Sequence, residues 1–249
     1  FVKEAEKPDE AYKINSATAT GVKTITVEMN KEVATTASFS AVVKKGTAVR
    51  ESKATVDGSK IILAMDAKLT AGAYTVTITG LEAATLTADL TVEKDETLTT
   101  YDVSDYIVAK TATNTTTGVI KFDALNQYGE KMAADTPQVS CSFGTVANGA
   151  VTAPTATKEG NVEVTNITPV LALVGTKGTV VLVDTKSGVT VTKEISYNTA
   201  ATASTLELAG AYHVNSGTIK SIAENNTISE YELLFTAKDQ YGYSMSAAD

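Results

Sequence analysis

The chain offers few side chains of the kind that catalysis or transition-metal binding requires. It has one histidine, His213, and one cysteine, Cys141, among 249 residues. A Ser-His-Asp triad or a Cys-His pair would have to be assembled from distant parts of the chain, and a zinc site built on histidine and cysteine would lack ligands. We therefore predict a protein that is not an enzyme. A carboxylate pair of the glycosidase kind is the one catalytic arrangement that the sequence leaves open.

Carboxylates are the side chains best able to bind a ligand, and the ligand that they favour is calcium. Calcium takes about six to eight hard oxygens from carboxylates, backbone carbonyls and water. The candidate ligands lie in and after a short charge run: Asp95, Glu96, Asp102 and Asp105, with Asp123 and Asp135 further along the chain. The alternative is that these residues form turns and solvate the surface, because no D-x-D-x-D-G loop occurs.

The single cysteine and the single histidine also have plain structural interpretations. In the segment 139–143, Cys141 has the strand parity of Val139 and Phe143, which predicts a small core residue. A reactive thiol is the alternative. His213 is expected to be an ordinary strand or surface residue. With one cysteine, no disulfide can form within the chain.

Charge and hydropathy exclude two classes of partner. The net charge is −8 and the sequence pI is about 4.8, and no stripe of Lys and Arg is present to bind phosphates, so nucleic acid is not an expected partner. No run of about 18 apolar residues occurs, so no membrane span is predicted. The charged first residues do not resemble a signal peptide, as expected of a mature or excised fragment of a secreted protein.

The elements that must position these residues are predicted to be β-strands. Threonine, valine and isoleucine are abundant, and β-branched residues suit a pleated, half-buried surface. Apolar side chains alternate with polar ones, as at Ile25, Val27 and Met29. The first 94 residues contain about six or seven such runs, as an immunoglobulin-like (Ig-like) sandwich requires.

One local motif strengthens this interpretation. Leu69, Gly72 and Tyr74 have the L-x-x-G-x-Y spacing of a tyrosine corner, in which the glycine allows a tight bend and the tyrosine hydroxyl bonds back to the backbone. The alternative is an ordinary tyrosine at a strand edge.

An internal repeat predicts several consecutive domains. Residues 122–132 align without gaps to residues 235–245, with Phe, Ala, Gln, Tyr, Gly and Met coinciding at an offset of 113 residues. The charge run at 93–96 and the small polar segment 198–204 are the predicted linkers. We expect Ig-like domains over 1–94 and 95–200, and a partial domain over 201–249, truncated and therefore the least stable.

The repeated F-x-A-x-[ND]-Q-Y-G resembles the strand signature of bacterial Ig-like domains, and residues 21–33 and 69–81 resemble parts of related domains in surface-layer (S-layer) proteins. This resemblance implies a structural protein, secreted to the cell surface or cell wall, that assembles with copies of itself into a two-dimensional lattice, often with calcium. Anchoring to a cell-wall polymer is implied for regions outside this sequence. The alternative is an adhesin stalk or a ligand-binding module of a bacterial surface protein.

Overall fold

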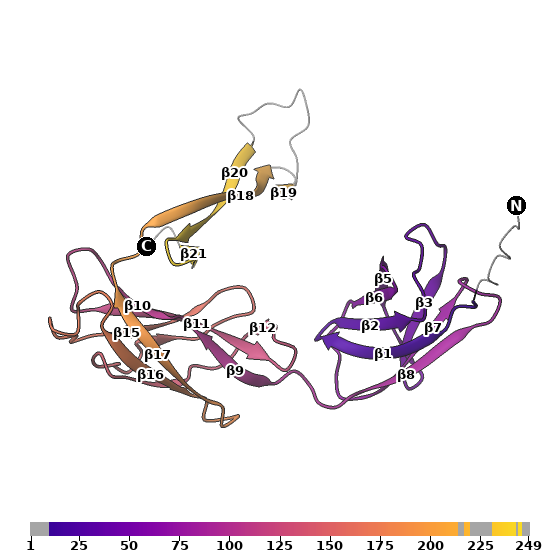
Figure 1. The fold of residues 1–249 in the computed structure, drawn as a ribbon, viewed down its shortest axis with the longest axis horizontal. Helices are drawn as coiled ribbons and strands as arrows, with labels where there is room; N and C mark the ends of the chain where they lie inside the picture. The colour runs from indigo at the N-terminus through magenta and orange to yellow at the C-terminus, as the bar shows by residue number, and fades with distance from the viewer. Residues whose placement is uncertain (1–9, 214–216, 220–230, 243, 246–249) are drawn as a thin grey trace, which may run out of the picture. The chain divides into compact units, whose positions relative to one another are not determined.

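The structure is a computed structural model that describes residues 10–213, 217–219, 231–242 and 244–245. Its regular elements are all β-strands (Figure 1). No helix long and apolar enough to cross a membrane is found in the part of the chain that the structure describes. The chain divides into two compact units, one of residues 1–99 with 125–131 and the other of residues 100–124 with 132–249. The predicted all-β class, with tandem Ig-like sandwiches, is confirmed.

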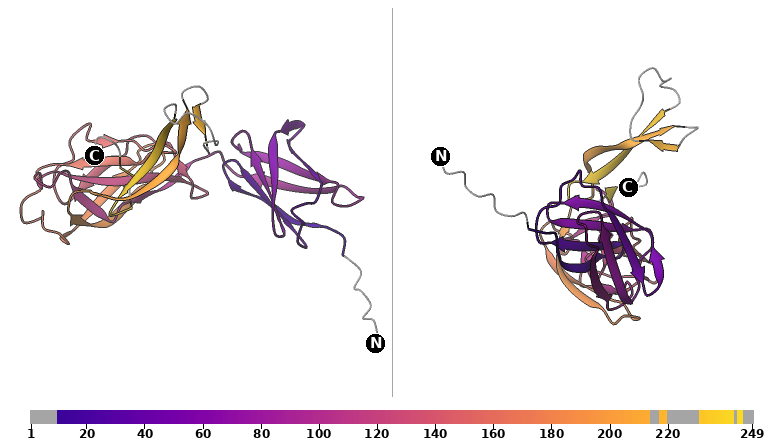
Figure 2. Two further views of the ribbon diagram at one scale, coloured as in Figure 1. Left: turned by 90° about the horizontal axis from the view of Figure 1, so that it is seen from above. Right: turned by 90° about the vertical axis from the view of Figure 1, so that its right-hand side faces the viewer.

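The first unit is a sandwich of two four-stranded sheets with the orders β1-β2-β6-β5 and β4-β3-β7-β8 (Figure 2). Its strands are β1 (Ile14–Gly21), β2 (Thr24–Met29), β3 (Ser40–Lys45), β4 (Ala48–Arg50), β5 (Ser52–Asp57), β6 (Lys60–Met65), β7 (Gly72–Thr79) and β8 (Leu86–Val92). The alternation read from the sequence is real, because Ile25, Val27 and Met29 are all buried between the sheets.

The tyrosine corner of the first unit is confirmed. The Tyr74 hydroxyl accepts a hydrogen bond from the Thr70 amide at 2.9 Å and donates one to the Thr70 carbonyl at 2.9 Å. Gly72 has a φ of 137°, a conformation that favours glycine. The Tyr74 ring is buried near the start of β7, so the corner ties the loop before β7 to the core.

The second unit closes a larger sandwich around its own core. The strands of the sandwich follow the order β13-β16-β17-β10-β11-β15-β14, with β9 and β12 also pairing with β11. They are β9 (Leu98–Val103), β10 (Tyr106–Ala109), β11 (Gly118–Asn126), β12 (Lys131–Met132), β13 (Gln138–Cys141), β14 (Val151–Thr152), β15 (Gly160–Val164), β16 (Lys177–Val183) and β17 (Thr190–Asn198). The β10–β17 pair is parallel and the other pairs of known register are antiparallel. Phe122, Phe143 and Tyr197 are among the largest side chains that this core buries.

The last strands form a single layer. They are β18 (Ala203–His213), β19 (Gly217–Ile219), β20 (Tyr231–Asp239) and β21 (Ser244–Met245), in the order β19-β18-β20-β21 (Figure 1). One face of the β18–β20 pair is apolar, and its Leu206, Leu208, Leu233 and Phe235 are half or more exposed. The predicted domain limits 1–94, 95–200 and 201–249, with the last domain partial, stay a prediction.

Candidate functional site

The repeated motif forms a tight turn after β11. The Asn126 Oδ1 accepts hydrogen bonds from the amides of Tyr128 at 2.9 Å and Glu130 at 3.0 Å. The Asn126 carbonyl accepts the Gly129 amide at 3.0 Å, and Gly129 has a φ of 76°. An Asx turn followed by a glycine in the left-handed region reverses the chain within four residues. It leaves the intervening Gln127 side chain free to reach outward.

Gln127 uses that freedom to bind the backbone of the segment between β8 and β9. Its Oε1 accepts the Thr97 amide at 2.9 Å, and its Nε2 donates to the Asp95 carbonyl at 3.2 Å. A primary amide suits this task because it carries an acceptor and donors on one planar group. Both partners belong to the first compact unit, as does the turn itself. These bonds satisfy the Thr97 amide and the Asp95 carbonyl, which would otherwise bond to water.

Charged side chains extend the contact on either side of Asn126. The Asn126 Nδ2 lies 3.1 Å from Glu96 Oε1 and 3.3 Å from Glu130 Oε2. Glu96 also forms a short ion pair with Lys68. Glu130 accepts the Val22 amide at 2.8 Å. The result is a chain of hydrogen bonds that joins the loop before β7, the 95–97 segment, the turn, and the β1–β2 turn.

The Glu96 carboxyl is the titratable group of this network. Its side chain is 15% exposed. Burial raises the pKa of Glu96, but hydrogen bonds from Lys68 and Asn126 and the Lys68 charge outweigh it, so its pKa is lowered from 4.5. The charged form is therefore the one that the folded protein favours.

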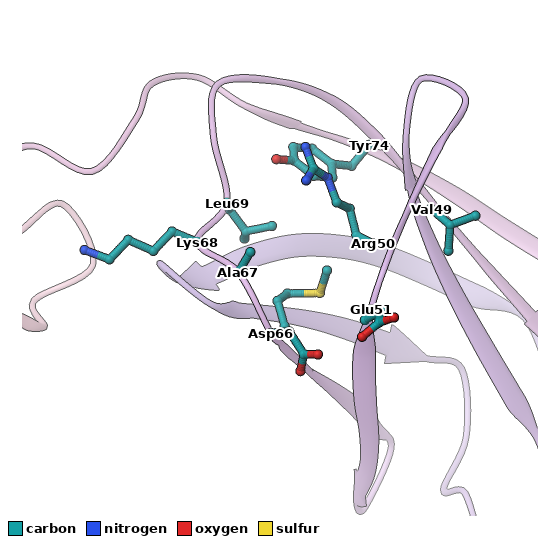
Figure 3. Close-up of a pocket in the computed structure, with 9 residues that line it drawn as sticks. Val49, Arg50, Glu51, Asp66, Ala67, Lys68, Leu69 and Tyr74 are labelled. Atoms are coloured by element: carbon teal, nitrogen blue, oxygen red, sulfur yellow. The ribbon is translucent and has the colours of Figure 1, made fainter.

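Two shallow depressions lie on the first unit. One, of about 220 Å³, is lined by residues that include Arg50, Glu51, Asp66 and Tyr74, while Lys68 extends away from the others (Figure 3). The other, of about 510 Å³, runs along β1 and β8 to Tyr128. Neither lining contains histidine or cysteine, and both carry mixed polar and apolar groups rather than a convergent set of reactive ones.

Three of the four predicted calcium ligands, Asp95, Glu96 and Asp105, are engaged in other contacts. Asp95 Oδ1 accepts the Ala71 amide at 2.7 Å, and Glu96 binds Lys68 and Asn126 as above. Asp105 pairs with Lys193 at 2.8 Å, and Asp102 is exposed on β9. Across the ranges that the structure describes, no three side chains of His, Cys, Asp or Glu gather as a metal site.

The other two candidate carboxylates, the single cysteine and the single histidine also have structural positions. Asp135 pairs with Lys186 at 2.6 Å, and Asp123 is buried on β11. Cys141 is half-buried on β13, and burial raises the pKa of its thiol, which disfavours the reactive thiolate. His213 lies at the end of β18 with its backbone paired to Gly217; its side chain lies outside the described residues.

Comparison with known proteins gives one family match and several structural likenesses. The CopC domain family matches residues 11–85, less than half of the chain. Invasin, a bacterial integrin-binding protein, is 17% identical with a TM-score of 0.34 over 95% of this chain and 47% of its own, so this chain spans about half the length of the invasin chain. InvD of Yersinia pseudotuberculosis is 12% identical (TM-score 0.29; 94% and 72% covered), and domains 3–5 of Drosophila OTK are 11% identical (0.25; 89% and 84%). No curated protein matches.

The family match corrects the expectation of calcium. The CopC domain is a periplasmic, copper-binding Ig-like β-sandwich, so calcium as the cofactor was wrong. The residues of this chain do not suit copper either. The matched segment contains no histidine or cysteine, and its two methionines, Met29 and Met65, are buried in the core. Imidazole and sulfur ligands are those that copper prefers, so the match extends to the sandwich and not to a copper site.

Sequence reasoning missed the residues that build this hydrogen-bond network. Gln127, Glu130 and Lys68 were not candidates, because each acts through a partner far away in the sequence. One signal was available: glutamine recurs at 127 and 240 in a turn where an amide side chain has no local task. A long polar side chain kept at a repeated turn indicates a contact outside the turn.

Proposed function

We propose that this chain is a non-enzymatic structural part of a protein located outside the cytoplasm, at the cell surface, and that it associates with copies of itself as in an S-layer lattice. The Ig-like sandwiches supply the framework, and the periplasmic setting of the CopC domain family supports the location. The observation that carries self-association is an exposed apolar loop on the second unit.

That loop connects β15 to β16. Val170, Leu173 and Val174 are 76%, 60% and 64% exposed. No charged residue occurs from Val164 to Thr176. Large apolar side chains at this exposure are ordinary when scattered, but three within five residues support the proposal of a protein contact here.

The loop is held in place rather than left loose. Its backbone is fixed by hydrogen bonds from the amides of Leu171 and Ala172 to the Thr168 carbonyl, at 2.9 and 3.0 Å, and from Gly175 to the Tyr197 carbonyl at 2.9 Å. Ile167, just before it, is buried in the core. A preordered apolar patch costs little conformational entropy when it binds.

Sedimentation velocity tests the proposal with the whole chain. At about 100 μM, where weak contacts are populated, the unmodified chain is expected to sediment as a concentration-dependent mixture of oligomers. The triple variant Val170→Asp, Leu173→Asp, Val174→Asp is expected to sediment as a monomer. Val49→Asp is the control, because Val49 is an equally exposed apolar residue, 61% exposed on β4 of the first unit. A triple variant that associates as the control does would overturn the role of the loop.

The exposed face of β18–β20 could also associate, so a second arm separates the two surfaces. Leu208→Asp with Phe235→Asp removes that face without touching the loop. If this arm alone abolishes association, the loop does not carry it. A chain that stays monomeric at every concentration favours an adhesin stalk or ligand-binding module instead, and negative-stain images would then show separate particles and no two-dimensional sheets.

A further inference from the structure

The turn after β11 has a second copy after β20, and the strands around it correspond. β11 and β20 span the same positions at the offset of 113 residues, and so do β12 and β21. The sequence repeat is therefore a structural repeat of strand, turn and strand. The contacts around the two copies of the turn can therefore be compared within one molecule.

The local geometry of the turn is the same in both copies. Asp239 Oδ1 accepts the Tyr241 amide at 2.9 Å, as Asn126 does for Tyr128. The Asp239 carbonyl accepts the Gly242 amide at 3.0 Å, and Gly242 has a φ of 86°. The exchange of Asn for Asp is accommodated because the turn needs only an acceptor oxygen at this position.

The glutamine contact is also the same. Gln240 Oε1 accepts the Thr202 amide at 2.7 Å, and Gln240 Nε2 donates to the Ala200 carbonyl at 2.9 Å. At the first turn the partners are Thr97 and Asp95, at 2.9 and 3.2 Å. In each copy one amide side chain binds a backbone N–H and a backbone carbonyl two residues earlier, in the segment that leads into the next set of strands.

The surroundings of the two turns differ. Tyr241 bonds through its hydroxyl to the Thr199 carbonyl at 3.1 Å, and its ring centroid lies 5.0 Å from that of Tyr106. Tyr128 instead lines the depression along β1 and β8. The tyrosine contacts thus depend on the site, whereas the two glutamine bonds do not.

We infer that [Asn/Asp]-Gln-Tyr-Gly is a repeated junction clamp, in which Gln127 and Gln240 each tie the preceding connecting segment to the turn and so stiffen the passage from one domain to the next. A connecting segment free in solution keeps its backbone rotations, and each residue that becomes fixed loses conformational entropy. Two bonds to groups two residues apart fix the segment between them. The inference does not depend on self-association.

Amide hydrogen exchange by NMR on the full chain tests the clamp directly. In Gln127→Ala, protection of the Thr97 amide is expected to fall about tenfold or more, while Thr202 is unchanged; in Gln240→Ala the result is reversed. The matched control is Gln138→Ala, since Gln138 is exposed on β13. The Val76 amide in the core reports whether each variant is folded. Protection at Thr97 and Thr202 that follows the control would overturn the inference.

Stiffening is measured separately at the first junction. Spin labels are attached at Thr36→Cys and Ala112→Cys in a Cys141→Ser background, because both positions are exposed. The distribution of distances between the two labels is recorded by double electron–electron resonance. Gln127→Ala is expected to broaden the distribution, and Gln138→Ala is expected to leave it unchanged. A distribution of unchanged width, together with lost protection at Thr97, would show that the glutamine binds the segment without stiffening the junction.

Discussion

At the scale of single residues, the molecule relies on side chains that bond to backbone groups. Tyr74 closes a corner, Asn126 shapes a turn, and Gln127 holds a connecting segment. In each case a polar side chain satisfies peptide groups that have no strand partner, which is the usual task of side-chain hydrogen bonds outside regular structure. Substitutions at these positions are expected to act through a few hydrogen bonds.

Replacing Tyr74 by phenylalanine tests the corner. The ring is retained and both bonds to Thr70 are lost, so the free energy of unfolding of the first unit is expected to fall by about 1–2 kcal/mol. Urea denaturation followed by circular dichroism measures it. Tyr12→Phe is the control, because the Tyr12 hydroxyl makes one exposed bond, to the Glu32 carbonyl at 3.2 Å. Equal effects of the two changes would contradict the importance of the corner.

Acid is expected to weaken the network around Glu96. The folded pKa of Glu96 lies below its unfolded value of 4.5, so its contribution is complete above about pH 4.5 and is lost as the pH falls through the folded pKa. Urea unfolding at about pH 6 and about pH 3 measures the difference. Glu96→Gln should lose less stability than the unmodified chain between these two pH values. An identical loss in both proteins would show that Glu96 does not contribute.

At the scale of elements, equivalent strands differ in what covers them. Ile120 and Phe122 on β11 are 0% and 2% exposed, whereas Leu233 and Phe235, their equivalents on β20, are 53% and 51% exposed. Strand pairing alone gives little stability in water without an apolar face packed against a second layer. β11 and β20 therefore have a similar sequence pattern and the same turn, and they differ mainly in how far their apolar side chains are buried.

Hydrogen exchange followed by mass spectrometry compares the two strands. Amides of β20 are expected to exchange at least about a hundredfold faster than those of β11, because opening β20 exposes little further apolar surface. β11 serves as the internal control within the same molecule. Equal protection would mean that the apolar face of β18–β20 is covered in solution, and the sedimentation variants would then identify whether a second copy covers it.

At the scale of the whole molecule, Ig-like units follow one another along the chain, and the division between the two compact units does not follow a single linker. The first unit includes 125–131, a turn that lies within the strands of the second. The backbone thus passes between the units at three places, and the Gln127 bonds lie within the first unit.

Copper binding distinguishes the shared fold from a shared metal site. We expect the chain to show no tight copper site in residues 11–85, because that segment has no histidine or cysteine and its methionines are in the core. Titration with copper sulfate, followed by electron paramagnetic resonance, measures this. His213→Ala removes the single imidazole and is the control for weak binding elsewhere. A tight equimolar signal that persists in this variant would contradict the expectation.

The sequence alone determined the strands, the tandem Ig-like arrangement, the tyrosine corner at Tyr74 and the repeat that relates Gln127 to Gln240. These depend on local periodicity and spacing, which are written directly in the order of residues. Only the tertiary structure decided that Gln127 binds the segment at Asp95 and Thr97, that Glu130 reaches Val22, and that Glu96 contacts Asn126 and Lys68. Those contacts join segments about 30 to 110 residues apart. They follow from which strands pair and from where the turns lie in the fold. The alternation of apolar and polar residues specifies which face of a strand is buried, but not which other segment packs against that face.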